Sequence, residues 1–203
     1  MGQTAPLNTR RHQKPPLFYG WYIVLIAFLA NTMSGGIGGY VFGLFIKPMT
    51  LEFGWGRTAI SAVFLVRTLT MALSAPIIGA MLDRKHGARL MMTLGGTVGA
   101  LGLISLSFTN SLLYFYIGFG VVWGIGMTVL GSELVTPTIV SKWFVEKRGR
   151  AIAISAMGIS LGGAVLVPST SFMIDSIGWR ETWTALGLLS FFVTVPLSLL
   201  LVR

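Results

Sequence analysis

The chain has 203 residues, of which 54% are hydrophobic and 10% are charged. Soluble domains carry about 25% charged residues, so this composition excludes an ordinary soluble domain and indicates a chain that folds in lipid. The net charge of +9 does not indicate a nucleic-acid partner, because the basic residues lie in short gaps between apolar segments.

Residues 1–18 are polar and basic and predict a flexible cytoplasmic tail. Six apolar segments follow, each long enough to cross about 30 Å of hydrocarbon, for which about 20 helical residues suffice. Backbone groups in lipid must bond to one another, so we expect helices throughout. The segments lie at about Tyr19–Ile46, Ala59–Leu82, Leu90–Phe108, Leu112–Val140, Ala151–Ile174 and Trp183–Val202. The sequence therefore predicts an all-α, multi-pass membrane protein with one six-helix bundle over residues 19–203.

Lysine and arginine are divided unequally between the two sides of such a bundle. Three, Lys47, Arg57 and Arg180, fall on one side, and Arg67 falls inside helix two. The remaining eleven fall on the other side: Arg10, Arg11, Lys14, Arg84, Lys85, Arg89, Lys142, Lys147, Arg148, Arg150 and Arg203. The positive-inside rule then places both termini in the cytoplasm, with the chain in an inner or plasma membrane.

Helix one contains two candidate substrate-binding residues, Asn31 and Tyr40. Four glycines occupy the five positions 35–39 between them. Such a run allows a helix to bend or to expose its backbone to a cavity. The Tyr40 hydroxyl is suited to hydrogen-bond a carboxylate, and packing against a neighbouring helix is the alternative.

Arg67 lies about ten residues into helix two, or roughly 15 Å at 1.5 Å per residue. An arginine at mid-bilayer costs at least about 2.5 kcal/mol on insertion scales, so it should face a wet cavity or a partner. A guanidinium binds a carboxylate by two parallel hydrogen bonds. We therefore predict that Arg67 binds an anionic substrate; a structural arginine held by helix carbonyls or by another helix is the alternative.

The gap after helix two, residues 79–89, reads Gly-Ala-Met-Leu-Asp-Arg-Lys-His-Gly-Ala-Arg. It resembles the signature loop of the major facilitator superfamily, with two residues instead of one between Asp-Arg and Gly. The resemblance implies a loop that biases inward-open against outward-open states, and a positive-inside loop with a glycine turn is the alternative. The residues to which it assigns this gating role are Gly79, which permits close helix approach, Asp83, which can face a helix N-terminus or pair with arginine, Arg84, Gly87 and Arg89.

Glu133 lies late in helix four, close to the cytoplasmic side. Its depth differs from that of Arg67 by roughly 15 Å, so a direct pair between them is not expected. We predict that Glu133 meets Arg84 or Arg89 and so latches helix four to helix two. A proton-carrying role is the alternative.

Further motifs resemble the monocarboxylate and oxalate/formate branch of the same superfamily, over about residues 20–203. They are Gly20-Trp21, the run Trp143-Phe-Val-Glu-Lys-Arg-Gly-Arg-Ala151, and Gly178-Trp179-Arg180. Gly158 and Gly162 follow the second motif at a spacing suited to helix packing. Two features depart from related carriers. The lysine that animal monocarboxylate carriers place in helix one is replaced by glycine, and Tyr114 and Tyr116 stand where many drug exporters carry an arginine.

The resemblance implies the N-terminal half, a 3+3 inverted repeat, of a twelve-helix transporter whose substrate path lies between its halves. The partners are then the lipid bilayer and either the missing C-terminal six-helix half or a second copy. The main hypothesis is secondary active transport of a small organic anion, a mono- or dicarboxylate, by alternating access, coupled to a proton or a counter-anion. One rival is a non-transporting truncated module or scaffold, and another is an exporter of drugs or hydrophobic cations.

No enzyme, cofactor or metal site is expected. No Walker A loop is present, so direct use of ATP is not supported. The absence of cysteine excludes disulfides and thiolate sites, and His12 and His86 are too far apart in sequence for a local metal motif.

Overall fold

The structure, a computed structural model, describes residues 20–82, 84, 87–130, 135–144 and 147–201. Every regular element in these ranges is a helix. Six helices of the described chain are long and apolar enough to cross a membrane, so the prediction of six membrane-spanning helices is confirmed. The tail predicted for residues 1–18 lies outside the described residues.

Two of the first three spans consist of more than one helical segment. Span one runs without a gap through α1 (Gly20–Gly35), the π-helix η1 (Gly36–Val41) and α2 (Phe42–Phe53). Span two consists of α3 (Arg57–Ser61) and α4 (Val63–Leu82), and span three is α5 (Gly87–Leu106).

The last three spans contain the second π-helix. Span four consists of α6 (Leu112–Phe115), the π-helix η2 (Tyr116–Trp123), α7 (Gly124–Leu130) and α8 (Val135–Trp143). Span five is α9 (Arg148–Ile177), and span six is α10 (Trp179–Leu201).

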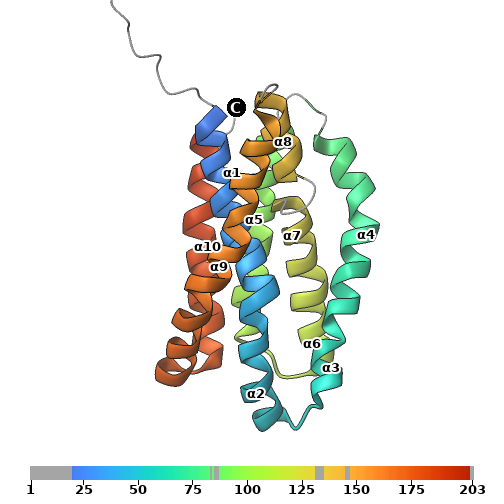
Figure 1. Cartoon of the computed structure of the whole chain (residues 1–203). Coiled ribbons are helices and arrows are strands. Elements are labelled where there is room, and N and C mark those ends of the chain that lie inside the picture. The colour runs from blue at the N-terminus through green and yellow to red at the C-terminus, as the bar shows by residue number, and fades with distance from the viewer. Residues whose placement is uncertain (1–19, 83, 85–86, 131–134, 145–146, 202–203) are drawn as a thin grey trace, which may run out of the picture.

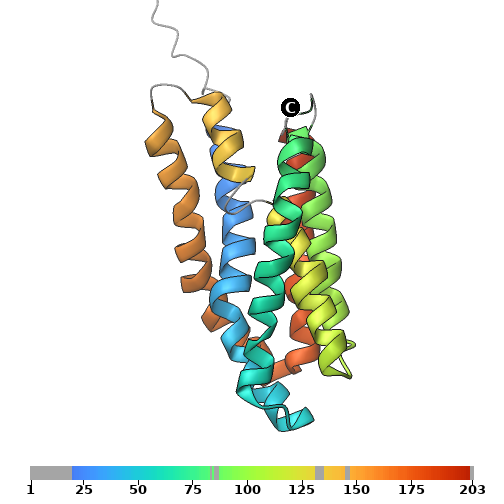
Figure 2. The same ribbon diagram turned by 90° about the vertical axis from the view of Figure 1, so that its right-hand side faces the viewer.

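The spans stand side by side as an elongated bundle (Figure 1), in which α1 begins and α10 ends at the same end. We call this the terminal end and the opposite end, where α2 ends, the distal end. α1 packs along α9 and α10, α5 packs along α10 and α7, and α4 packs along η2 and α7. Seen from the side (Figure 2), α9 stands on one side of α1 while α4 and α5 stand on the other. Span two, which contains α4, lies at the edge of the bundle, and only 11% of its most apolar stretch is buried inside the protein.

Apart from Arg67, the described lysines and arginines lie in two groups at the two ends of the bundle, as the count of cations in the sequence predicts. Lys47, Arg57 and Arg180 belong to α2, α3 and α10 near the distal end. The cations at the terminal end follow α4, begin α5, end α8 or begin α9: Arg84, Arg89, Lys142, Lys147, Arg148 and Arg150.

Span one extends to Phe53, seven residues beyond the predicted boundary at Ile46. The prediction ended where apolar residues give way to Lys47, but a charge alone does not break helical hydrogen bonding. The helix instead ends at Gly54, whose φ of 69° is left-handed and whose N–H bonds to the Thr50 carbonyl. Glycine is the residue that adopts this conformation without strain.

The bundle has an aromatic core toward its distal end and an aliphatic core toward its terminal end. In the aromatic core, Phe45 stacks on Trp183 with ring centres 3.7 Å apart, which joins α2 to α10. Phe42 and Phe119 join the same span to η2 at 4.8 Å. These large side chains fix the distal half of span one against spans four and six.

α9 approaches α1 at two glycines. A Cβ atom at Gly162 would lie 2.5 Å from the Thr32 carbonyl oxygen, and one at Gly158 would overlap the Phe28 carbonyl oxygen. The two backbones are therefore in direct contact, as small residues permit in membrane bundles.

Candidate functional site

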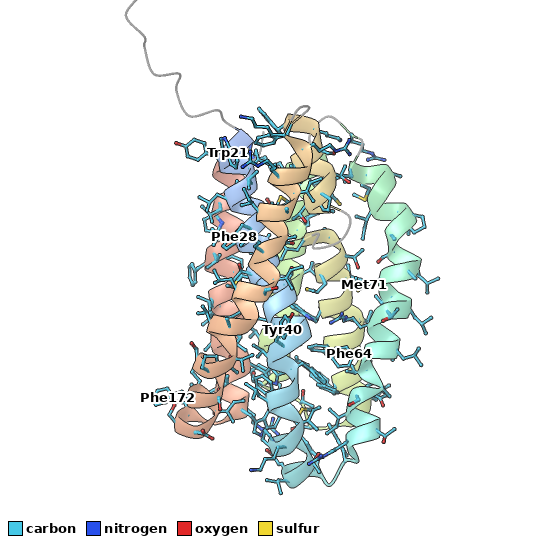
Figure 3. The ribbon with its side chains drawn as sticks, viewed as in Figure 1. Trp21, Phe28, Tyr40, Phe64, Met71 and Phe172 are labelled. Atoms are coloured by element: carbon cyan, nitrogen blue, oxygen red, sulfur yellow. The ribbon has the colours of Figure 1, made fainter. Side chains whose placement is uncertain are left out.

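Arg67 directs its side chain from α4 toward span one. Its Nη1 donates a 2.9 Å hydrogen bond to the carbonyl oxygen of Gly38 in η1. Its guanidinium carbon lies 5.2 Å from the centre of the Phe64 ring, on the same helix. Figure 3 shows Phe64 on α4 and Tyr40 on η1 at a similar height, midway along the bundle. The guanidinium therefore lies between spans one and two, about midway along the length of the bundle.

Arg67 lies between the two π-helices of the described chain. η1 supplies the Gly38 carbonyl, while η2 packs along α4. A Cβ atom at Gly120 would lie 2.7 Å from Val66 Cγ1, and a Cβ atom at Gly124 would lie 3.3 Å from Arg67 Cγ. Glycine at these positions lets span four approach the backbone that carries Arg67. π-Helices are rare in proteins, and those that do occur are often found at functional sites.

The Trp123 indole faces the same point as Arg67. A Cβ atom at Gly38 would lie 3.1 Å from Arg67 Nη1, 3.3 Å from Met127 Cε and 3.4 Å from Trp123 Nε1. Trp123 is 0% exposed, and its indole N–H has no hydrogen-bond partner in the described chain. Buried donors normally have one. We call Gly38, Arg67, Trp123 and Met127 the Arg67 cluster. In it Arg67 donates to the Gly38 carbonyl, and the Trp123 indole N–H lies near the same glycine.

The other two predicted binding residues differ in their surroundings. Tyr40 is 52% exposed, and a Cβ atom at Gly163 of α9 would lie 2.8 Å from its ring. Asn31 is 2% exposed. Its amide donates to the Ser155 carbonyl at 2.8 Å and accepts from the Thr136 hydroxyl at 3.3 Å. Tyr40 thus shares η1 with the Arg67 cluster, whereas Asn31 joins α1 to α9 and α8 inside the protein and faces no open space.

The predicted gating loop is described only in part. Arg84 and Arg89 are exposed at the terminal end. The Gly87 N–H bonds to the Arg84 carbonyl at 2.9 Å, and a Cβ atom at Gly87 would overlap the Met81 carbonyl oxygen. The tight turn into α5 therefore requires glycine at position 87.

Of three further predictions, two concern residues outside the described ranges and one differs from the structure. Asp83 and Glu133 lie outside the described residues, so the predicted latch stays a prediction. Gly79 was expected to allow close helix approach, yet no described atom lies within 4 Å of the position of its Cβ. The reason is that α4 stands at the edge of the bundle and this face of it has no neighbour in the described chain.

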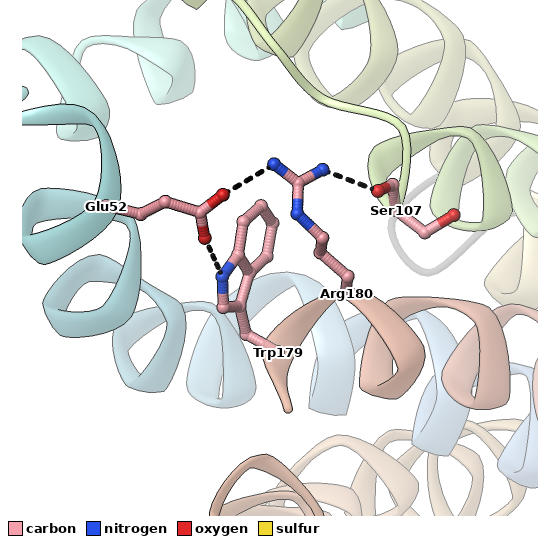
Figure 4. A network of polar contacts seen from close by, with 4 residues as sticks. All are labelled: Glu52, Ser107, Trp179 and Arg180. Carbon is pink, nitrogen blue, oxygen red and sulfur yellow. Dashed lines mark hydrogen bonds and ion pairs between the residues drawn. The ribbon is translucent and has the colours of Figure 1, made fainter. Parts of the chain in front are cut away.

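The sequence did not reveal a polar network at the distal end, which joins spans one, three and six (Figure 4). Trp179 Nε1 donates to Glu52 Oε2 at 2.7 Å, and Arg180 Nη2 donates to Glu52 Oε1 at 2.7 Å. Arg180 Nη1 also donates to the Ser107 carbonyl at 2.8 Å, and its guanidinium lies 4.5 Å from the Trp179 ring centre. We call these four residues the distal clasp. The only signal in the sequence was the Gly178-Trp179-Arg180 motif.

The chain matches the family model described as Major Facilitator Superfamily over residues 17–203. Several curated proteins are similar to it at low identity. Human monocarboxylate transporter 7 is 26% identical over 177 residues, or 87% of this chain and 33% of the relative. Mouse monocarboxylate transporter 11 is 29% identical over 178 residues, or 87% of this chain and 38% of the relative.

A third relative, rat monocarboxylate transporter 13, is 26% identical over 182 residues, or 89% of this chain and 41% of the relative. The chain thus spans between 33% and 41% of the length of these curated relatives. Six helices over this share agree with the N-terminal half of the matched fold.

Proposed function

The chain belongs to the Major Facilitator Superfamily, a family of membrane transporters, and from this premise we propose that it forms the N-terminal half of a secondary transporter for a small organic anion. The substrate class is a mono- or dicarboxylate, moved by alternating access and coupled to a proton or a counter-anion. The similarity to three proteins named monocarboxylate transporters supports this substrate class.

The observation that carries the proposal is the position of Arg67. Its guanidinium lies about midway along an apolar bundle and bonds to the Gly38 carbonyl of the π-helix η1. A cation at this depth is costly, and membrane proteins retain such cations where a substrate or an ion pathway needs them. A carboxylate bound here accepts two hydrogen bonds from the guanidinium and brings an acceptor to the buried Trp123 indole.

Alternating access requires a second wall opposite this half. We propose that the missing C-terminal six-helix half, or a second copy, covers the exposed faces of spans one, two, four and five. The loop at residues 79–89 then biases the inward-open against the outward-open state. With the positive-inside rule, the terminal end lies in the cytoplasm and the distal end faces the opposite compartment.

The test is anion uptake by the full-length protein in proteoliposomes, with lactate and oxalate as probes. Arg67→Ala should reduce uptake by at least about tenfold, because a hydrogen bond to a charged group contributes about 1.5–3 kcal/mol. Arg67→Lys should restore only part, because lysine lacks the bidentate geometry. Arg57→Ala, which removes an exposed arginine of α3, serves as the control and should leave uptake unchanged.

The same assay separates the two rivals. Uptake that is unchanged in Arg67→Ala would exclude Arg67 as the anion-binding residue. Absence of uptake of either probe by the folded parent would favour the non-transporting module. Competition by hydrophobic cations in place of carboxylates would favour the exporter.

A further inference from the structure

A pocket opens between α2 and α9 at the distal end, with a volume of about 500 Å³. We call it the distal pocket. Its walls include Gly43, Leu44, Lys47, Pro48, Ile174 and Asp175. It is separate from the Arg67 cluster, because Lys47 follows Gly38 by nine helical residues, which is about 14 Å along the helix.

The distal pocket carries one charge of each sign on facing helices. Lys47 is exposed on α2, and Asp175 is exposed on α9. Within the described ranges the one ion pair is Arg180–Glu52, so Lys47 and Asp175 do not bond to each other. The distal clasp holds Glu52 against Arg180 and Trp179, which leaves Lys47 and Asp175 as the charges presented to the pocket.

The rest of the pocket wall suits a small organic molecule. Leu44, Pro48 and Ile174 supply apolar surface. Gly43 also lines the pocket, and no described atom lies within 4 Å of the position of a Cβ atom there. A pocket with an apolar wall and a few convergent polar groups is typical of small-molecule sites.

We propose that the distal pocket binds a carboxylate that also bears a cationic nitrogen, such as an amino acid. The carboxylate faces Lys47, the nitrogen faces Asp175, and the carbon chain contacts the apolar wall. A simple carboxylate is attracted by Lys47 but repelled by Asp175. A simple amine is attracted by Asp175 but repelled by Lys47. Discrimination therefore comes from both an attractive and a repulsive charge. The distal pocket is separate from the Arg67 cluster, so this inference goes beyond the proposed function and does not depend on it.

The test measures direct binding to the full-length protein in nanodiscs, with three probes of similar length: 4-aminobutyrate, butyrate and butylamine. 4-Aminobutyrate should bind about tenfold more tightly than either other probe, an advantage that one additional ion pair near water supplies. Lys47→Gln and Asp175→Asn should each abolish the advantage. Gly43→Leu should reduce binding of all three probes, because it fills the pocket without changing a charge.

Two matched controls neutralise charges at the same end of the bundle outside the pocket. Arg57→Gln and Glu181→Gln remove an exposed cation of α3 and an exposed anion of α10, and both should keep the parent's preference. Equal binding of the three probes by the parent, or a preference that survives Lys47→Gln and Asp175→Asn, would overturn the inference.

A parallel uptake assay separates this inference from the proposed function. Uptake of lactate or oxalate without any preference for 4-aminobutyrate would leave the transporter proposal standing and remove the distal site. Binding that prefers 4-aminobutyrate in a protein that takes up no carboxylate would support the site and contradict the transport proposal.

Discussion

Trp179 donates its indole N–H to Glu52 at 2.7 Å, a hydrogen bond between residues 127 positions apart that fastens the distal end of span one to the start of span six. Arg180 occupies the other oxygen of the same carboxylate. The aromatic core lies directly inward of this contact, where Phe45 stacks on Trp183. The distal half of span one is therefore fixed on two levels to span six.

Removal of the indole donor should destabilise the bundle. Trp179→Phe keeps an aromatic ring but removes part of a buried indole and the hydrogen bond to a charged acceptor, which alone is worth about 1.5 kcal/mol. Thermal unfolding in detergent should shift downward accordingly. Trp55→Phe is the control. It makes the same tryptophan-to-phenylalanine change at the same end of the bundle, where Trp55 stacks on Phe53 outside the distal clasp. Since Trp179 and Glu52 share one interaction, Trp179→Phe and Glu52→Gln should not be additive; additive effects would show that the bond contributes nothing.

The contact between α9 and α1 should depend on two glycines. Gly158→Ala and Gly162→Ala place a methyl group against the carbonyl oxygens of Phe28 and Thr32, and overpacking of this kind costs about 1–3 kcal/mol. The melting temperature in detergent measures the loss. Gly149→Ala is the control on the same helix, because no described atom lies within 4 Å of its Cβ position. It should be neutral or stabilising, and equal losses at the three positions would contradict the packing explanation.

The sequence predicted what depends on composition and length, and little of what depends on contacts between distant residues. Six apolar segments sufficed for six helices because lipid leaves the backbone few alternatives. The glycines at positions 35–39 indicated an irregular helix, and η1 lies there. Asn31 was predicted to bind substrate, but its partner Ser155 is 124 residues away and the contact exists only once α9 lies on α1. The Glu52–Arg180 pair was missed for the same reason.

The turn between α4 and α5 allows packing and gating to be distinguished. Gly87→Ala should lower thermal stability, because its methyl group meets the Met81 carbonyl oxygen. Gly79→Ala should be neutral or stabilising, because its surroundings in the described chain are open and alanine favours the helix more than glycine does. If the loop biases transport states, Gly79→Ala should nevertheless slow uptake by the full-length protein. Unchanged uptake and stability in Gly79→Ala would remove Gly79 from the proposed gating role.

The orientation in the membrane can be tested by single cysteines, since the natural chain contains none. Arg89→Cys and Arg150→Cys at the terminal end should react with a membrane-impermeant maleimide only from the cytoplasmic side. Arg57→Cys at the distal end should react only from the opposite side. Labelling of Arg89→Cys and Arg57→Cys from the same side would contradict the six-span topology, and a reversed pattern would contradict the placement of the termini.

The Arg67 cluster should be sensitive to one methyl group at Gly38 and insensitive to one at its neighbour. A Cβ atom at position 38 would lie 3.1 Å from Arg67 Nη1 and 3.4 Å from Trp123 Nε1, so Gly38→Ala should crowd both groups and strain the hydrogen bond from Arg67 to the Gly38 carbonyl. Gly39 belongs to the same π-helix, and no described atom lies within 4 Å of its Cβ position. Both substitutions change the helix propensity of span one equally, so any difference between them comes from the cluster.

We therefore expect Gly38→Ala to reduce carboxylate uptake by about tenfold, equivalent to about 1.4 kcal/mol, while Gly39→Ala retains the uptake of the parent. Melting temperatures of both variants show whether each remains folded. Equal uptake by the two variants would indicate that the geometry around Arg67 does not matter for transport. Equal loss in both would assign the effect to the bending of η1, because that is the property the two substitutions share.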